Sequence, residues 1–125
     1  MTNAEQVSDW MDGYVRAWLT NDPEDIRSLF TEDAEYSYAP WEEPLQGQDA
    51  IVADWIENKD EPEDWSFEWK PVAVDGRTAV IEARTPYLDG RTYWNVWIFT
   101  LEDDGRVSSF TEWYMQEPQE IPSVD

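Results

Sequence analysis

The chain has 125 residues, and its 29 Asp and Glu against 8 Lys and Arg give a net charge of −21. This length predicts one domain, and a hydrophobic content of 41% with nine tryptophans predicts that the domain is folded. A surface with this much negative charge repels the phosphate backbone of nucleic acids and the anionic headgroups of lipids. We therefore expect neither nucleic acid nor membrane partners. Because the chain has no histidine and no cysteine, we expect no disulfide, no zinc site and no histidine-based triad. Acid–base chemistry would fall to Asp, Glu, Tyr, Arg or Lys.

The hydropathy of the chain bears on its location. No basic stretch followed by an apolar one opens the sequence, which argues against a signal peptide. No apolar run approaches the roughly 18 residues of a membrane span, so we predict a cytoplasmic protein. The acidic residues Asp33, Glu42 and Glu43 lack the spacing of a Ca²⁺ or Zn²⁺ site, and we expect no metal and no cofactor.

The first part of the chain has helical periodicity. Apolar residues within 7–18 recur at steps of three and one, which predicts one face of an amphipathic helix. Thr2 and Glu5 have the spacing of a capping box at its start. Asp22 and Pro23 predict the N-cap and first-turn proline of a short second helix.

A strand, a loop and a third helix are predicted next. Ala34, Tyr36 and Tyr38 alternate with polar residues, as in a short strand. Residues 39–48 contain two prolines and predict a loop. The apolar spacing within residues 51–56 predicts the third helix.

The second half of the chain predicts a sheet. After an acidic, solvated loop at residues 60–64, alternating or β-type sequences predict four strands, within residues 65–70, 78–85, 91–101 and 106–115. Asp-Gly pairs between the last three strands predict hairpin turns. Three helices followed by an antiparallel meander predict an α+β domain, in which a cone-shaped, curved antiparallel sheet wraps around the helices and leaves an open mouth for a small molecule. The domain is expected to span residues 1–115, and residues 116–125 an acidic, loose tail.

Counting back from the two turns predicts the strand register. A two-residue turn at Asp104-Gly105 places Trp97 opposite Glu112 and Asn95 opposite Tyr114. The same count from a two-residue turn at Asp89-Gly90 places Glu82 opposite Trp97 and Arg84 opposite Asn95. Six residues, most of them polar, are then predicted to share one face of the sheet: Glu82, Arg84, Asn95, Trp97, Glu112 and Tyr114.

A different register of the first hairpin stays open. If it slips by one residue, Glu82 and Arg84 turn outward, and the more hydrophobic pair Ile81 and Ala83 turns inward. The position of Glu82 and Arg84 therefore depends on the length of one turn.

Several short motifs occur in a characteristic order: Tyr14-Val15-Arg16-Ala17-Trp18, Leu29-Phe30-Thr31-Glu32-Asp33-Ala34, Gly47-Gln48-Asp49-Ala50-Ile51, Tyr93-Trp94-Asn95-Val96-Trp97, Asp104-Gly105-Arg106-Val107 and Glu112-Trp113-Tyr114. In this order the chain resembles the nuclear transport factor two-like superfamily and, within it, the SnoaL-like proteins. The resemblance implies that the polar sheet face is concave and forms a pocket, and that the protein is a homodimer. The superfamily includes isomerases, dehydratases, cyclases, epoxide hydrolases and proteins that only bind, so the fold does not give the function.

The ketosteroid isomerase branch matches in part. Tyr14 falls where that branch places its tyrosine donor, and Trp55 where it has a supporting tyrosine. The general base of that branch is replaced by Tyr38, and its buried acid falls near Trp97. The dehydratase and cyclase branches use histidine, which this chain lacks.

The limonene-type epoxide hydrolase branch matches better. Its enzymes activate water with one carboxylate and protonate the epoxide with a second, and an arginine bridges the two. By resemblance, Glu112 aligns with one carboxylate and Glu82 falls near the other, with Arg84 close by, so these three residues are the catalytic candidates. Two glutamates near one arginine leave one carboxylate in excess, which is expected to hold a proton near neutral pH.

The aromatic residues provide the binding candidates. We expect a pocket for a small apolar molecule that is lined by Tyr14, Trp18, Tyr38, Trp55, Asn95, Trp97, Phe110 and Tyr114. Other tryptophans are expected to fill the core or cover a dimer surface on the convex face. Two functions stay open: a histidine-free acid–base enzyme of epoxide-hydrolase or isomerase type, and a non-catalytic ligand-binding or accessory protein.

Overall fold

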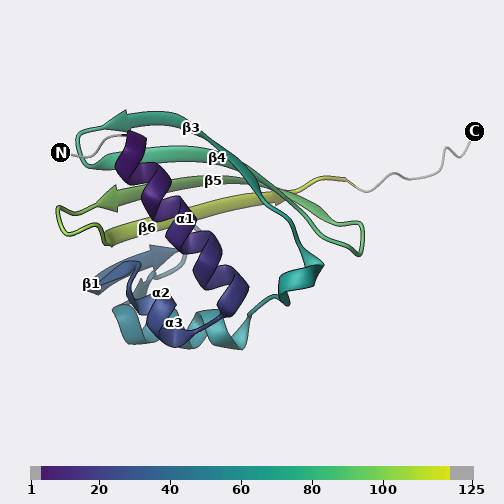
Figure 1. The fold of residues 1–125 in the computed structure, drawn as a ribbon, viewed down its shortest axis with the longest axis horizontal. Coiled ribbons are helices and arrows are strands. Elements are labelled where there is room, and N and C mark those ends of the chain that lie inside the picture. Colours follow the sequence, from purple (N-terminus) through teal and green to yellow (C-terminus); the bar gives the residue numbers. More distant parts are fainter. Residues whose placement is uncertain (1–3, 119–125) are drawn as a thin grey trace, which may run out of the picture.

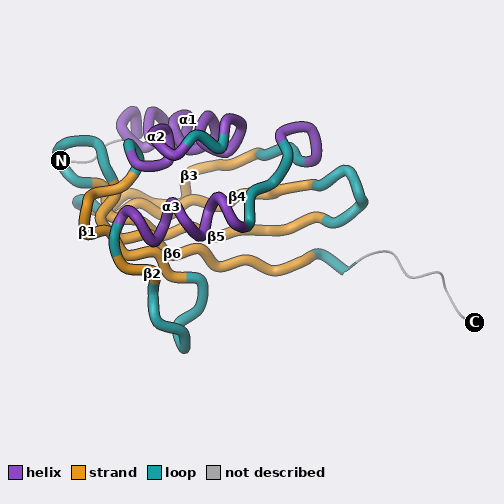
Figure 2. The backbone as a smooth tube through the Cα atoms, turned by 90° about the horizontal axis from the view of Figure 1, so that it is seen from below, coloured by secondary structure: helices purple, strands orange, loops and turns teal. Residues whose placement is uncertain are grey.

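The computed structural model describes residues 4–118, which form an α+β fold (Figure 1). The helical segments are α1 (Ala4–Thr20), α2 (Pro23–Arg27), α3 (Gln48–Glu57) and the single 3-10 turn η1 (Pro62–Asp64). The strands are β1 (Phe30–Ser37), β2 (Leu45–Gln46), β3 (Glu68–Asp75), β4 (Thr78–Pro86), β5 (Thr92–Leu101) and β6 (Val107–Gln116). Figures 1 and 2 show α1 lying across one face of the curved sheet, and α3 packs beside β1. The predicted fold class is confirmed.

The helices begin and end close to their sequence signals. The buried face of α1 is formed by Val7, Trp10, Met11, Tyr14 and Ala17. The first four belong to the predicted apolar stripe, whose other members, Val15 and Trp18, are half-buried. Asp22 caps α2 by accepting the backbone N–H of Glu24 at 2.8 Å, and Pro23 occupies the first turn, as predicted. Thr2, one half of the predicted capping box, lies outside the described residues.

The sheet is mixed rather than wholly antiparallel. Its strand order is β2-β1-β6-β5-β4-β3. The pair β1–β6 is parallel, and the other neighbouring pairs are antiparallel. A hairpin turn requires antiparallel strands, but β1 and β6 are separated by most of the chain, so no turn constrains their direction. Most of the predicted acidic tail, residues 119–125, lies outside the described residues.

One predicted register is confirmed and the other is wrong by one residue. In β5–β6, Trp97 pairs with Glu112 and Asn95 pairs with Tyr114, as predicted. In β4–β5, however, Trp97 pairs with Ile81 and Asn95 pairs with Ala83. Because side chains alternate between the two faces of a strand, Ile81 and Ala83 point into the core.

The length of the first turn explains this difference. Tyr87 N–H donates to the Arg91 carbonyl at 2.8 Å, which closes a three-residue loop instead of the predicted two-residue turn. Gly90 ends this loop with φ 98°, a conformation that residues with a Cβ rarely adopt. The extra loop residue moves every side chain of β4 to the other face relative to the prediction.

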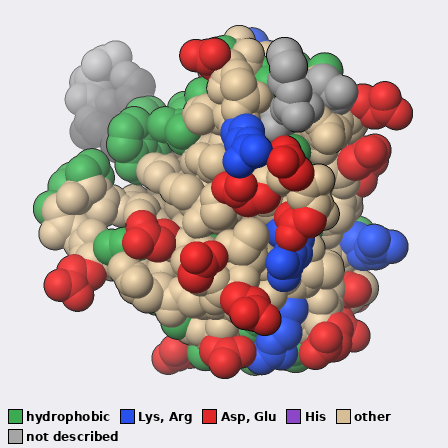
Figure 3. Space-filling model, turned by 90° about the vertical axis from the view of Figure 1, so that its left-hand side faces the viewer, with side chains coloured by type: hydrophobic (Ala, Val, Ile, Leu, Met, Phe, Trp, Pro, Cys, Tyr) green, Lys and Arg blue, Asp and Glu red, His purple; other side chains and the backbone are tan. Residues whose placement is uncertain are grey.

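The surface carries most of the charge. Figure 3 shows acidic side chains spread over one face of the molecule, with Lys and Arg among them. Arg77, for example, pairs with Glu102 at 3.1 Å and with Asp103 at 3.0 Å. Exposed pairs of this kind add little stability, so the acidic coat is mainly solvated. Within residues 4–118 no helix is both long and apolar enough to span a membrane.

Candidate functional site

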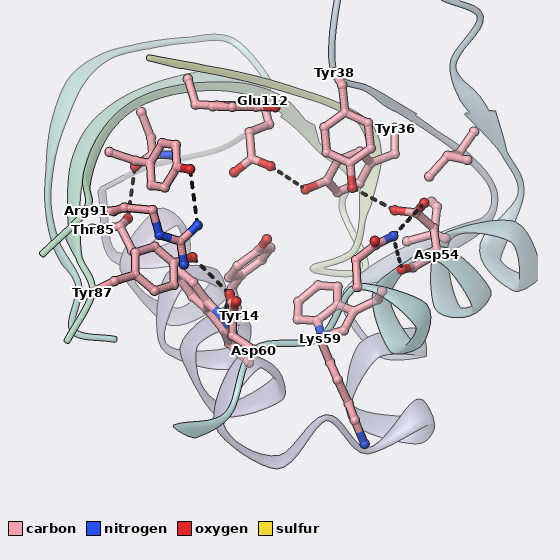
Figure 4. A pocket seen from close by; sticks show the side chains of 18 residues that line it. Tyr14, Tyr36, Tyr38, Asp54, Lys59, Asp60, Thr85, Tyr87, Arg91 and Glu112 are labelled. Atoms are coloured by element: carbon pink, nitrogen blue, oxygen red, sulfur yellow. Dashed lines mark hydrogen bonds between the residues drawn. The ribbon is translucent and has the colours of Figure 1, made fainter. Parts of the chain in front are cut away.

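A cavity of about 460 Å³ lies between α1, α3 and the concave face of the sheet (Figure 4). This size suits a small organic ligand. Eight of its 18 lining residues are aromatic: Tyr14, Trp18, Tyr36, Tyr38, Trp55, Tyr87, Tyr93 and Tyr114. The acidic residues of its lining are Asp54, Asp60 and Glu112.

Glu112, on β6, presents a carboxyl group that two hydrogen bonds hold in the cavity wall. Tyr36 donates its hydroxyl to Oε1 at 3.2 Å, and Trp97 donates its indole N–H to Oε2 at 2.9 Å. Burial raises the pKa of Glu112 from its ordinary 4.5 to about 7, and outweighs the two hydrogen bonds, which lower it. No Lys or Arg among the described residues forms an ion pair with Glu112. Its carboxyl group can therefore gain or lose a proton near neutral pH.

Three tyrosines surround this carboxyl group. Burial is the main cause that raises the pKa values of Tyr14 and Tyr36 well above the usual range, and the charge of Glu112 adds to it. Burial also raises the pKa of Tyr38, which donates its hydroxyl to Asp54 Oδ2 at 2.7 Å. All three phenols thus keep their protons and act as hydrogen-bond donors.

Asp60 anchors the opposite side of the cavity. Its Oδ2 accepts hydrogen bonds from the Trp18 indole at 3.1 Å and from the Tyr87 hydroxyl at 3.0 Å. Its backbone carbonyl accepts the side-chain amide of Asn21 at 3.1 Å. Asp60 therefore joins the end of α1 to the β4–β5 hairpin. It belongs to the acidic segment predicted as a solvated loop, and at Asp60 that prediction is wrong.

Most of the predicted binding residues surround the cavity. Of that set, the lining contains Tyr14, Trp18, Tyr38, Trp55, Asn95 and Tyr114, together with Glu112 from the catalytic set. Trp97 and Phe110 are fully buried core residues behind the wall and do not line it. Trp97 still acts on the site, because its indole holds Glu112.

Glu82 and Arg84 lie on the outer face of the sheet, away from the cavity. Glu82 is 3.7 Å from Lys70 Nζ, and Arg84 is 3.9 Å from Glu68 and stacks over Trp94 at 5.8 Å. The prediction that these two residues share the pocket face with Glu112 is thus wrong. The cause is the one-residue shift in β4 described above.

Sequence reasoning missed several lining residues. Tyr36 carried a usable signal, because it alternates with Tyr38 on one strand and the period of two is strict. Asp60, Tyr87 and Arg91 lie in loops or at strand ends, where no periodicity shows which way a side chain points. Within the described part of the chain, no group of acidic residues is arranged to hold a metal ion.

A second, more open groove adjoins the mouth of the cavity. Its volume is about 880 Å³, and it shares Tyr38, Asp54, Asn58 and Tyr114 with the first cavity. Trp41, at the tip of the β1–β2 loop, lines it and is 84% exposed. The groove thus extends the mouth along an aromatic surface.

The fold is shared with several solved structures. One is a candidate ketosteroid isomerase from Kribbella flavida DSM 17836, with a TM-score of 0.71 and 20% identity over 98% of this chain and 87% of that one. An NTF-2 like protein of unknown function from Burkholderia xenovorans LB400 has a TM-score of 0.72 and 21% identity, over 94% and 88% of the two chains. An LEH-like epoxide hydrolase from M. tuberculosis has a TM-score of 0.65 and 15% identity, over 89% and 84%. At these identities the likeness shows the fold and leaves the activity open.

The sequence itself matches a family model. No curated protein is significantly similar in sequence. The model of the SnoaL-like domain, however, matches residues 11–110, which include the second half of α1, strands β1 to β5 and most of the cavity lining. Glu112 and Tyr114, on the last part of β6, lie beyond the match. The chain therefore belongs to the SnoaL-like domain family.

Proposed function

We propose that the protein binds a small, largely apolar molecule in the aromatic cavity and moves a proton on it through Glu112. The observation that carries this proposal is a protonatable carboxyl group in the cavity wall, fixed by Tyr36 and Trp97 and without a cationic partner among the described residues. A group with a pKa of about 7 can act both as base and as acid at physiological pH.

An isomerase-type reaction suits a single carboxyl group of this kind. As the base, Glu112 would take a proton from a carbon next to a carbonyl group, and the electron pair of the broken C–H bond would move onto the carbonyl oxygen. Tyr14, whose phenol keeps its proton, would donate a hydrogen bond to that oxygen, while Tyr36 continues to hold Glu112. In a β,γ-unsaturated ketone, Glu112 would then return the proton to the γ-carbon. The electron pair on oxygen re-forms the carbonyl group and the carbon–carbon double bond moves into conjugation with it, so the reaction needs no other acid.

Epoxide hydrolysis fits the cavity less well. It requires a second carboxyl group and, in the related enzymes, an arginine that bridges the two. Glu82 and Arg84, the candidates for these parts, pair with Lys70 and Glu68 on the outer face. Asp60 and Arg91 do line the cavity, but Asp60 lies on the side opposite Glu112, and Arg91 is held by Asp89 at 2.7 Å (Figure 4). For this reason we favour proton transfer between carbon atoms over the opening of an epoxide.

Binding without catalysis is the second candidate function. Polar groups of the wall satisfy one another: Tyr38 bonds Asp54 at 2.7 Å, and Thr85 donates to Asn95 Oδ1 at 2.9 Å. A wall with its hydrogen bonds already made can serve as a preformed binding surface for an apolar ligand. Saturable binding without any product would favour this function.

The Glu112→Gln variant tests the proposed reaction. It keeps the size of the side chain and removes its ability to exchange a proton, so we expect turnover of an active ketone from a panel of unsaturated ketones and epoxides to fall at least about a hundredfold. Glu57→Gln, the same change on an exposed residue at the end of α3 and outside the cavity lining, serves as the control and should leave turnover unchanged. Unchanged turnover in Glu112→Gln would refute the assignment.

We also infer that a second copy of the chain covers the outer face of the sheet. Trp94 and Val96 on β5 are exposed there, opposite Met115 and Trp113 on β6. The neighbouring pairs Lys70–Glu82 and Arg84–Glu68 balance the charge of this face. In a chain with a net charge of −21, a neutral apolar face is where two copies repel each other least.

Sedimentation equilibrium tests the dimer. We expect a mass of two chains for the wild type and of one chain for Trp113→Glu, because the new charge would be buried against the second copy. Leu19→Glu places the same charge on an exposed position of α1, on the other side of the sheet, and should leave the dimer intact. A wild type that sediments as a monomer at micromolar concentration would contradict the inference.

The cytoplasmic location stays a prediction from the sequence.

A further inference from the structure

The carboxylates of the cavity lack the cations that charged groups near a protein interior require. Among the described residues, no Lys or Arg forms an ion pair with Asp54, Asp60 or Glu112. A partly buried carboxylate is costly unless it is paired or hydrogen-bonded. The cavity therefore has an excess of negative charge that its own wall does not neutralise.

The two basic residues of the lining are directed elsewhere. Figure 4 shows the Lys59 side chain extending away from the cavity. Arg91 is held by Asp89, whose Oδ2 accepts its Nε–H at 2.7 Å, and its guanidinium group stacks over the Tyr87 ring at 4.8 Å. Neither cation therefore neutralises Asp60 or Glu112, which Figure 4 shows on opposite sides of the cavity.

Asp60 leaves one of its two carboxylate oxygens without a donor from the described part of the protein. Both of its side-chain hydrogen bonds, from Trp18 and Tyr87, end on Oδ2. Oδ1 accepts no hydrogen bond from any described residue. The two donors are aromatic side chains that also line the cavity, and the faces of such rings attract cations.

We propose that the ligand of this cavity is an amine whose ammonium group binds Asp60 Oδ1 while its apolar body lies among the aromatic rings. An ammonium group supplies the hydrogen-bond donor and the positive charge that this carboxylate lacks. A metal ion fits less well, because the acidic residues of the described chain do not converge on one point. The strongly negative surface would also attract a cationic ligand toward the cavity. This inference deepens the proposed function and rests on it only for the position of the binding site.

A series of three ligands on the wild-type protein tests the charge preference. Phenylpropylamine, phenylpropanol and phenylpropionate share an apolar body and carry a positive, a neutral and a negative head. By isothermal titration calorimetry at neutral pH, we expect the amine to bind at least about tenfold more tightly than the alcohol. We expect no measurable binding of the carboxylate ligand.

The Asp60→Asn variant tests the position of the ammonium group. Its amide oxygen can still accept from Trp18 and Tyr87, but the charge is gone, so amine affinity should fall about tenfold while alcohol affinity stays the same. The matched control is Asp64→Asn, which makes the same change of charge on an exposed residue outside the cavity. It should leave both affinities unchanged. The ligand series on the wild type decides the question even if Asp60→Asn does not fold.

Three results would overturn the inference. These are equal affinities of amine and alcohol, no amine binding at millimolar concentration, and equal losses of amine affinity in the two variants. The proposed reaction is tested separately by turnover in Glu112→Gln. A loss of turnover there without any preference for amines would refute this inference and leave the proposed function standing. A preference for amines together with unchanged turnover in Glu112→Gln would support this inference and refute the proposed reaction.

Discussion

The Glu112→Gln variant should be more stable than the wild type at about pH 8 and equally stable at about pH 4. The native pKa of Glu112 is about 7, raised by burial from an ordinary 4.5. Between these two values the native state binds a proton that the unfolded state releases. The stabilisation of the native state that comes from protonated Glu112 is complete below pH 4.5, and it is lost as the pH rises through 7. Glutamine does not titrate, so at alkaline pH the variant should gain up to about 3 kcal/mol relative to the wild type.

Urea unfolding, followed by tryptophan fluorescence at several pH values, measures this difference. The other acidic residues affect both proteins alike, so the difference between the two curves isolates Glu112. Glu57→Gln should run parallel to the wild type at every pH, because Glu57 is exposed at the end of α3. A pH-independent difference between Glu112→Gln and the wild type would show that burial does not shift this carboxyl group.

The same prediction links stability to function. A carboxyl group that costs stability above neutral pH could have been replaced by glutamine without loss of packing. The glutamine oxygen could accept from the Trp97 indole, and its NH2 group could donate to the Tyr36 hydroxyl. Perturbed carboxyl groups in clefts are characteristic of functional sites. A stability gain in Glu112→Gln together with a loss of turnover would identify Glu112 as a residue kept for chemistry.

The two hairpins show how far the sequence predicts the site. Both turns are three-residue loops: Glu102 N–H donates to the Arg106 carbonyl at 2.8 Å, just as Tyr87 N–H donates to that of Arg91. The β5–β6 pair then has a register shift between Thr100 and Leu101, which restores the register predicted for a two-residue turn. The β4–β5 pair has no such shift, so Glu82 faces outward. The correct placement of Glu112 thus depended on two deviations from the prediction, the longer turn and the register shift in the strands, which cancel each other. The Asp-Gly motif indicates neither of them.

The fold was more predictable than the site because its signals are repeated. The apolar stripe of α1 and the alternation along the strands each involve many residues that all indicate the same period. Asp60 lies between α3 and η1, where its direction is set by Trp18 and Tyr87 from distant parts of the chain. Tertiary contacts of this kind carry no local sequence pattern.

The Trp10→Ala variant should lose about 4 kcal/mol of stability, the largest loss we expect for a single core side chain. Trp10 is 4% exposed, and its ring centroid lies 4.6 Å from that of Phe99 and 5.7 Å from that of Phe110. Its indole N–H donates to the Leu29 carbonyl at 3.0 Å. Removing the ring would leave a cavity between α1 and the sheet, at a cost large against a typical total of 5–15 kcal/mol.

Two further variants separate the contributions of packing and hydrogen bonding. In Trp10→Phe most of the ring volume stays, and the Leu29 carbonyl keeps the N–H of Val107 at 2.8 Å, so the loss should be only about 1–2 kcal/mol. Trp41→Ala removes an exposed indole and should change stability by less than about 0.5 kcal/mol. Chemical denaturation at one pH measures all three. If Trp10→Ala cost no more than Trp41→Ala, α1 would not be anchored through Trp10, and the cavity wall that α1 forms with Tyr14 and Trp18 would need another support.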